Sequence, residues 1–335
     1  MNQTNNEPKI LTVSPSPHIR AKDTTGSIMM DVVIALAPAA VWGVYIFGTR
    51  ALLMMLVCIL AAVGAEALTQ LLLRRPITVG DMSAVVTGLL LAMNLPVTLP
   101  LWQAALGSVF AIVLVKQIFG GIGKNFMNPA LAGRAFLMMA FAGNMTKYTA
   151  AYDRVWFSAA DAVASATPLS SLKDGILPET SLVDMLLGRT GGCIGEVSAA
   201  LLLAGGIYLL CKRVISWHIP VTYLGTVAAL SFVICRADGA RWEVMLCELL
   251  SGGLVLAAFF MATDYVTSPV TRGGKIVFGI GCGALTMLIR TFGSYPEGVS
   301  FSILIMNALV WYLDAAFRPR VFGKGRGKGK VAKNG

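Results

Sequence analysis

Several residues with oxygen-bearing side chains surround a threonine in the stretch Asp161-Ala-Val-Ala-Ser165-Ala166-Thr167-Pro168. A proline disfavours helical backbone at the residue before it. Thr167 is therefore expected in an extended backbone, with its hydroxyl projecting from the chain rather than folding back onto a helical turn. Taken on its own, however, the stretch favours an ordinary turn or a helix stop over a functional site.

Two acids lie next to apolar runs, Asp81 before the third run and Asp264 after the eighth. Acids in or near a membrane are costly and often mark ion paths, so both are candidates for one. Asp81 is equally suited to cap the start of a helix, where a carboxylate is favoured. Asp264 closes a helix, where a negative charge is disfavoured, and nearby Arg272 and Lys275 offer a structural ion pair as the alternative.

Asn125, Asn128 and Pro129 open the fifth apolar run. An Asn-Pro-Ala turn occurs in the re-entrant pores of water channels, but those proteins carry two such turns and this chain has one. Arg134 follows in the same run, where it is expected either to pair with a phosphate or carboxylate or to pack as a snorkelling side chain.

The composition places these residues in a membrane protein. Of the 335 residues 56% are hydrophobic and only 13% are charged, with a mean hydropathy of +0.73, whereas a soluble domain carries about 25% charged residues. No basic groove with interleaved aromatic residues is present, which argues against nucleic-acid binding. The six cysteines include no C-x-x-C pair, so neither a disulfide framework nor a zinc site is predicted.

The sequence predicts an all-α integral membrane protein with about ten transmembrane helices. A straight span needs roughly 20 apolar residues, and the fifth, sixth, seventh and ninth runs are shorter, as expected for helices that extend into their flanks or break to line a cavity. The predicted spans are 28–48, 52–73, 83–99, 103–118, 128–142, 195–210, 219–234, 244–262, 276–289 and 300–317.

The distribution of basic residues predicts the orientation of these spans. With the N-terminus inside, the cytoplasmic segments hold 18 of the 27 lysines and arginines, and the opposite face holds seven. This bias follows the positive-inside rule. Both termini are therefore expected in the cytoplasm, and the loop 143–192, which carries Thr167, is expected on the outer face.

Five spans precede the long loop and five follow it, so the second half is expected to lie inverted relative to the first. A weak echo between Gly88-Leu-Leu-Leu-Ala92 and Gly253-Leu-Val-Leu-Ala257 agrees with this interpretation. Inverted repeats commonly build a site with a route to each face. The predicted organisation is an N-terminal segment (1–27), a first five-helix half (28–142), the external loop (143–192), a second half (193–317) and a basic tail (318–335).

The motifs, taken together and in this order, resemble one family over residues 13–320. The chain is similar to the D subunits of Rnf electron-transport complexes and, more distantly, to the B subunits of sodium-pumping NADH:quinone oxidoreductases. Ala162 departs from the flavin-attachment motif, which often has glycine there. The residues that carry the resemblance are Ser14-Pro-Ser-Pro-His18-Ile-Arg20, Gly80-Asp81-Met-Ser-Ala-Val-Val-Thr87-Gly88, Asn94-Leu-Pro96, Phe119-Gly-Gly-Ile-Gly-Lys-Asn125-Phe-Met-Asn128-Pro-Ala, Asp161-x-x-x-Ser165-Ala166-Thr167 and Met261-Ala-Thr-Asp264.

The resemblance implies that Thr167 carries FMN through a phosphodiester, attached from FAD by a dedicated flavin transferase, with Ser165 as the fallback site. It also implies a pocket at Asn125 and Asn128 for a second, non-covalent flavin such as riboflavin, and it raises Asp81 and Asp264 as ion-path residues. No NAD site and no metal ligands are expected in this chain.

The implied role is electron relay, with a contribution to Na⁺ or H⁺ transport, in a ferredoxin:NAD oxidoreductase complex of a bacterial inner membrane. The implied partners are the A, B, C, E and G subunits of such an Rnf complex and the lipid bilayer. The alternative from another class is a stand-alone solute channel or transporter with five-plus-five helices and no redox cofactor.

Overall fold

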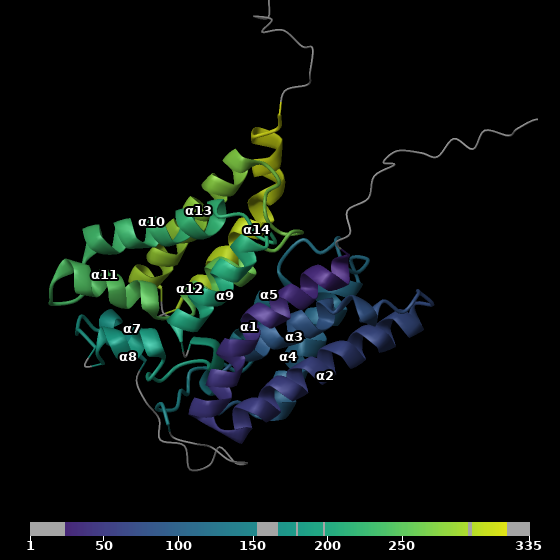
Figure 1. The fold of residues 1–335 in the computed structure, drawn as a ribbon, viewed down its shortest axis with the longest axis horizontal. Coiled ribbons are helices and arrows are strands. Elements are labelled where there is room, and N and C mark those ends of the chain that lie inside the picture. The colour runs from purple at the N-terminus through teal and green to yellow at the C-terminus, as the bar shows by residue number, and fades with distance from the viewer. Residues whose placement is uncertain (1–23, 153–166, 179, 197, 294–296, 320–335) are drawn as a thin grey trace, which may run out of the picture.

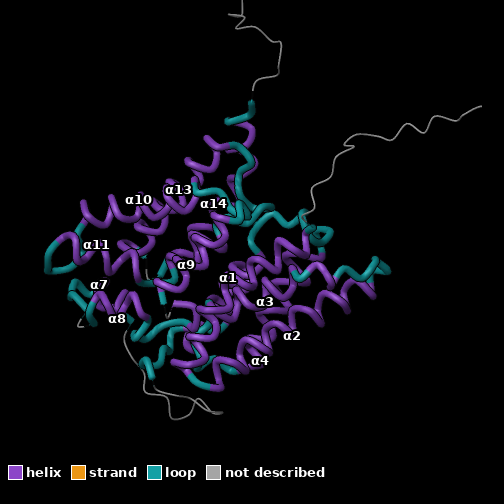
Figure 2. Tube along the Cα trace, viewed as in Figure 1, coloured by secondary structure: helices purple, strands orange, loops and turns teal. Residues whose placement is uncertain are grey.

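The computed structural model describes residues 24–152, 167–178, 180–196, 198–293 and 297–319, so Asp161, Ser165 and Ala166 lie outside the described residues. Figure 2 shows helices joined by loops and turns, with no strand in these ranges. The prediction of an all-α protein is confirmed. The longer helices are α1 Thr25–Phe47, α2 Thr49–Leu72, α3 Ser83–Met93, α4 Leu101–Phe110, α5 Pro129–Ala140, α9 Ala199–Cys211, α10 His218–Ile234, α11 Arg241–Leu250, α13 Arg272–Phe292 and α14 Val299–Ala316. The short elements are η1 Val79–Asp81, α6 Ala142–Met145, α7 Pro168–Lys173, α8 Leu182–Leu187, η3 Ile194–Glu196 and α12 Leu254–Leu256, with π-helical turns η2 Ala111–Gln117 and η4 Ala257–Met261 continuing α4 and α12.

Not every predicted span is a full-length helix. Helices α1, α2, α13 and α14 are long and apolar enough to cross a membrane, and α11 with α12–η4 forms a fifth candidate that is bent by 61°. The other apolar helices are shorter, with 10 to 17 residues. The structure therefore supports a multi-pass membrane protein, and the count of ten spans stays a prediction.

The two halves of the chain pack in the same way. Helix α2 packs against α3 and α4, and its counterpart α10 packs against α11 and α13. The halves meet where α1 contacts α9 and α5 contacts α14, and Figure 1 shows the purple and blue helices beside the green and yellow ones. At the first contact, a Cβ added to Gly205 would lie 2.3 Å from the Ala35 carbonyl oxygen, so only glycine permits this approach.

Reciprocal contacts between α5 and α14 support the repeat. Arg134 of α5 donates to Ser300 Oγ at the start of α14, at 3.0 Å. Asn307 of α14, with its amide oxygen turned towards the start of α5, accepts from Asn128 N at 3.1 Å. Each helix thus sends a polar side chain to the first turn of its counterpart, as expected for two halves related by a pseudo-two-fold axis.

Both halves contain a short third helix that starts from a left-handed residue. Met82 precedes α3 with φ of 62°, and Gly253 precedes α12 with φ of 62°. The left-handed conformation carries a steric cost for a residue with a Cβ, so the methionine must be held there by its surroundings. The π-helical turns η2 and η4, which follow α4 and α12, are a feature that is frequent at functional sites. These irregular helices belong to the third, fourth and eighth predicted spans, whereas the short ninth span is the unbroken helix α13, which extends into its flanks.

The two ends of the bundle differ in what they carry. Helix α1 begins and α14 ends at one end, and α7 and α8 lie at the opposite end (Figure 1). We call these the terminal end and the loop end. At the loop end Lys173 Nζ donates to the Gly293 carbonyl at 2.8 Å. This arrangement agrees with an even number of crossings, and which end faces the cytoplasm stays a prediction.

Candidate functional site

A cavity of about 350 Å³ lies at the terminal end, between the two halves. Its walls come from α1, α3, η2, α9 and η4 and from the loops before α5 and after η4. The apolar part of the wall includes Ile28, Val32, Phe259 and Phe260. A volume of this size and an apolar wall with a few polar groups are typical of a site for a small molecule or cofactor.

Asn125 and Asn128 both line this cavity, as the sequence predicts. The Asn128 amide is already engaged, since Oδ1 accepts from Ala130 N and Leu131 N at 3.0 and 3.2 Å and Nδ2 donates to the Met261 carbonyl at 3.2 Å. Asn128 thus caps α5 and joins it to η4 of the other half. Asn125 uses only its Nδ2, which donates to the Met127 carbonyl at 3.1 Å, so its amide oxygen faces no donor among the described residues.

Asp264 also lines the cavity, where η4 has ended. Its oxygens accept from Thr267 Oγ1 at 3.0 Å and from Val266 N at 3.5 Å. No ion pair with Arg272 or Lys275 forms in the described part of the chain, so the alternative of a structural ion pair is not supported. Burial raises the pKa of the Asp264 carboxyl above its usual range, and the hydrogen bonds only partly offset this shift.

Asp81 has a different position from Asp264. Its Oδ1 accepts from Ser83 N at 2.8 Å and from the Ser83 hydroxyl, so it caps the start of α3. Asp81 does not line the cavity, but Ser83 does. The helix-cap interpretation of Asp81 therefore fits the structure, and any contribution to an ion path would pass through Ser83.

A buried ion pair that the sequence interpretation missed forms one wall of the cavity. Lys116 Nζ lies 2.8 Å from both Glu66 oxygens and 2.6 Å from Ser83 Oγ. Glu66 also accepts from Gln117 Nε2 at 2.7 Å and from Gln70 Nε2 at 3.3 Å. Lys116 and Glu66 are 3% and 1% exposed, so both charges depend on each other.

Lys116 is one of the 18 basic residues that the charge count places on the cytoplasmic side, and the structure corrects that interpretation. It belongs to the π-helical turn η2 and is buried in the bundle. The sequence does contain a sign of this ion pair. Glu66 is an acid within an apolar run, and a charge at such a position requires a partner.

Thr167 lies at the loop end, where it is the N-cap of α7. Its backbone is extended, with φ of −79° and ψ of 151°, as Pro168 predicts. The expectation that the hydroxyl projects freely is wrong. Because Pro168 occupies the first turn of a helix, Thr167 Oγ1 folds onto that turn and accepts from Ser170 N at 3.2 Å. The side chain is only 7% exposed.

Thr167 shares a second, much smaller cavity with two acids, of which Glu297 is buried and Glu196 half-buried. About 10 Å³ of space, room for a single water molecule, lies between Thr167, Ser251, Gly252, Glu196 and Glu297. None of these acids was predicted as a site residue. Glu196 follows the long loop and Glu297 precedes α14, so the fold brings them to Thr167 from distant parts of the chain.

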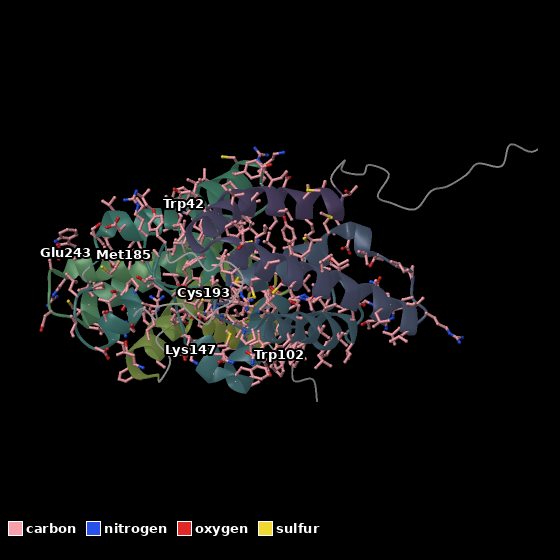
Figure 3. All side chains as sticks on the ribbon, turned by 90° about the horizontal axis from the view of Figure 1, so that it is seen from below. Trp42, Trp102, Lys147, Met185, Cys193 and Glu243 are labelled. Atoms are coloured by element: carbon pink, nitrogen blue, oxygen red, sulfur yellow. The ribbon has the colours of Figure 1, made fainter. Side chains whose placement is uncertain are left out.

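Arg134 reaches the same acids from α5. It forms an ion pair with Glu297 and donates to Asn94 Oδ1 at 3.1 Å. Tyr148 donates to Glu297 Oε1 at 2.7 Å. Of the two roles expected for Arg134, the pairing with a carboxylate is the one observed. Figure 3 shows Cys193, which neighbours this group, in the interior of the bundle.

A second ion pair lies beside these groups. Arg290 donates to Glu248 Oε2 at 2.7 Å and to the Ser251 carbonyl at 3.1 Å. Arg236 pairs with the other Glu248 oxygen. Arg290 and Glu248 have no exposed surface. The charge count assigned Arg236 to an outer loop and Arg290 to a span end, whereas the structure joins both to Glu248.

Comparison with known proteins gives consistent relatives along the whole chain. The family described as NQR2, RnfD, RnfE matches residues 12–323. The D subunit of the Na(+)-translocating ferredoxin:NAD(+) oxidoreductase complex of Acetobacterium woodii is 49% identical, covering 93% of this chain and 95% of its own. The D subunit of the proton-translocating ferredoxin:NAD(+) oxidoreductase complex of Clostridium ljungdahlii is 43% identical, with 95% and 97% of the chains covered. The D subunit of the ion-translocating oxidoreductase complex of Stutzerimonas stutzeri is 40% identical, over 93% and 96%. The chain belongs to the NQR2, RnfD, RnfE family.

Proposed function

We propose that this protein is the membrane flavoprotein subunit of an ion-translocating ferredoxin:NAD oxidoreductase complex of the Rnf type. Its role is to relay electrons through FMN held covalently at Thr167 and to contribute to Na⁺ or H⁺ transport. The names of the relatives support the complex, and the sequence from Asp161 to Thr167 supports the flavin.

The position of Thr167 is the observation that best supports this role. Thr167 is the N-cap of α7, and α7 lies at the loop end, opposite the start of α1 and the end of α14 (Figure 1). Thr167 also borders the small cavity that Glu196 and Glu297 line. A phosphodiester would replace the hydroxyl hydrogen and leave Oγ1 as the acceptor for Ser170 N, so the residues fit the bond. The adjoining space of about 10 Å³ does not hold a flavin ring, which would therefore lie outside that cavity. The bound flavin supplies one- and two-electron chemistry.

The cavity at the terminal end is the proposed place for a second, non-covalent flavin. Its volume of about 350 Å³ and its apolar walls suit a flat ring. The residues that would hold the ring are Asn125, through its free amide oxygen, and the side chains of Phe259 and Phe260. Asn128 would act indirectly, by fixing the loop that ends at α5.

Asp264 is the proposed ion-path residue at this cavity, with Asp81 linked to it through Ser83. A carboxylate without an ion pair, beside a cavity and after the end of a helix, is stabilised by a cation or by a proton. Either ion is compatible with this site, since the named relatives include one sodium-translocating and one proton-translocating complex.

The remaining chemistry is assigned to partners. The A, B, C, E and G subunits of the complex would carry the metal centres and the NAD site, and a flavin transferase would attach the FMN. The setting is the bacterial inner membrane, with both termini in the cytoplasm and the loop 143–192 on the outer face.

The test is in-gel flavin fluorescence of this subunit after denaturing electrophoresis. Thr167→Ala should abolish the fluorescence and leave the subunit in the membrane, and Thr167→Ser, which keeps a hydroxyl, should retain some of it. Flavin mass that remains on the Thr167→Ala chain would refute the assignment, and Ser165→Ala would then test the fallback. A chain without any covalent flavin would favour the solute channel or transporter instead.

A further inference from the structure

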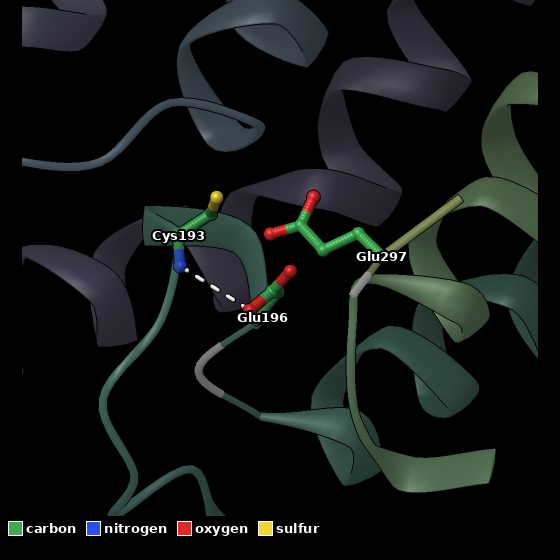
Figure 4. Close-up of side chains that lie close together, drawn as sticks. All are labelled: Cys193, Glu196 and Glu297. Carbon is green, nitrogen blue, oxygen red and sulfur yellow. Dashed lines mark hydrogen bonds between the residues drawn. The ribbon is translucent and has the colours of Figure 1, made fainter. Parts of the chain in front are cut away.

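Glu196 and Glu297 point towards each other in the interior of the loop end (Figure 4). One oxygen of each, together with the Cys193 sulfur, lies within 4.8 Å of the others. Glu196 Oε2 accepts from Cys193 N at 3.3 Å. Glu196 Oε1 is buried, and no described residue donates a hydrogen bond to it. Two carboxylates at such a separation, with one oxygen unsatisfied, are unfavourable when both are ionised.

Fewer arginines bond to Glu196 and Glu297 than to the nearby Glu248. Arg134 is the guanidinium that bonds directly to the pair, through Glu297. Arg290 donates its Nε to the Glu297 carbonyl at 3.2 Å and directs its Nη1 to the Glu248 carboxylate. Glu248 thus has two arginines, counting Arg236, whereas the pair of acids has one. Tyr148 and Cys193 add no positive charge.

A metal ion does not suit this position, although three potential ligand atoms converge there. Arg134 Nη2 lies 3.7 Å from the Cys193 sulfur and is paired with Glu297, so its charge would repel another cation. The adjoining space of about 10 Å³ is too small for a hydrated ion. A proton needs no such space, and on Glu196 it would supply the donor that the two facing carboxylates lack.

We propose that Glu196 and Glu297 share one proton, and that the pair binds a second proton when negative charge arrives at Thr167. All three residues line the same small cavity. This inference rests on the proposed flavin at Thr167, whose phosphodiester already places one negative charge beside the pair. On one-electron reduction of that flavin by another carrier of the complex, the pair would take up a proton from water at the loop end. When the electron leaves, the pair releases that proton.

The inference gives the loop end a chemical role that differs from that of the terminal cavity. Glu196 and Glu297 would couple proton uptake to the redox state of the site at Thr167, and Arg134 would hold Glu297 in place for it. The electrostatic interaction between the Glu196 and Glu297 carboxylates is strong because their surroundings exclude water. Glu248 serves as an internal comparison, since two arginines, Arg236 and Arg290, pair with its carboxylate.

The experiment is reduced-minus-oxidised infrared difference spectroscopy of the intact complex in H₂O and D₂O. The wild type should show a protonated-carboxyl carbonyl band in the reduced state that shifts in D₂O. Glu196→Gln and Glu297→Gln should each remove it, and the control Glu248→Gln should keep it. If a glutamine variant does not assemble, Glu196→Asp retains the carboxyl and should move the band rather than delete it.

The outcomes separate this inference from the proposed function. Spectra of Glu196→Gln that match the wild type, in a complex whose gel band still fluoresces, would overturn the shared proton and leave the flavin assignment intact. Flavin that persists on Thr167→Ala would overturn the proposed function, and the redox coupling with it. A stoichiometric metal in this subunit that is lost on Cys193→Ala would replace the proton with a metal site.

Discussion

The buried ion pairs Glu66–Lys116 and Glu248–Arg290 lie one in each half, with their acids on different elements, α2 and α11, and they border very different spaces. In each pair the cation comes from the fourth helix of its half and bonds to a serine near the start of the short third helix, Ser83 or Ser251. Beside Lys116 lies a cavity of about 350 Å³, whereas the space near Ser251 is about 10 Å³.

The comparison shows that the same helix arrangement can either leave a cavity beside a buried ion pair or fill that space with side chains. At the loop end Glu297 precedes α14 and brings Arg134 and Tyr148 with it. At the terminal end the residue directly before α5 is Asn128, whose amide caps the helix and contacts η4, whereas Gly298 stands directly before α14. The two halves therefore differ in that a cavity lies beside one ion pair, while further charged side chains fill the space beside the other.

The largest expected effect comes from removing Lys116. Lys116→Met leaves Glu66 buried with only amide donors, and breaking a buried ion pair in this way costs about 3–5 kcal/mol. The detergent-solubilised complex should lose this subunit at a clearly lower temperature, measured by thermal aggregation on gels. The double variant Lys116→Met with Glu66→Gln removes both charges and should recover most of the loss. If the double variant is no more stable than Lys116→Met alone, the unpaired charge of Glu66 is not the cause of the lost stability.

Arg290→Met should have a smaller effect, although Arg290 has no exposed surface. Arg236 still pairs with Glu248 in this variant, so no acid is left alone. The lost hydrogen bond to the Glu248 carboxylate is worth about 1.5–3 kcal/mol, and the same thermal assay should report a lesser shift than for Lys116→Met. If Arg290→Met lowered the stability as much as Lys116→Met, Glu248 would depend on Arg290 as strongly as Glu66 depends on Lys116, and the inferred difference between the halves would be wrong.

Filling the terminal cavity should affect the ligand more than the fold. Val32→Phe adds bulk to the cavity wall, and because space is available the stability change should stay below the roughly 1–3 kcal/mol typical of an overpacked core. The amount of flavin released by denaturation should fall, while covalent fluorescence on Thr167 is unchanged. Ile34→Phe, on the exposed face of the same helix, is the control and should release the wild-type amount.

Hydropathy alone predicted the positions of the helices. Each predicted span overlaps a helix in the structure. The predicted third span, Ser83–Leu99, is too long, since α3 ends at Met93, before Asn94-Leu-Pro96. The predicted ninth span, Ile276–Ile289, is too short, since α13 runs from Arg272 to Phe292. Glycines and flanking charges lower the hydropathy of α13, but Gly279 packs closely against Thr222 of α10, which the sequence does not reveal.

The candidate site was predictable only where a local motif marks it. Asn125, Asn128 and Asp264 stood out beside their apolar runs, the family resemblance pointed to a pocket at the two asparagines, and all three residues line the cavity. Lys116 and Glu66 are 50 residues apart, and Arg134 and Glu297 are 163 apart. The first pair is set by packing within one half and the second by packing between the halves, so a single sequence shows only that a charge inside an apolar run needs a partner.

The smallest expected effect on stability is that of Asp264→Asn, and it tests whether the terminal cavity serves ion transport. Burial raises the pKa of Asp264 in the folded protein above that of the unfolded chain, so the ionised carboxylate is disfavoured by folding. Wild-type stability should therefore fall slightly as pH rises from the unfolded pKa, about 3.9, to the folded one, and Asp264→Asn should remove this dependence without loss of stability at neutral pH. Ion uptake into vesicles, driven by electron transfer, should instead be lost or should lose its cation dependence while the flavin remains. Unchanged uptake at both saturating and limiting cation would make Asp264 an ordinary residue after a helix end, held by Thr267 and Val266.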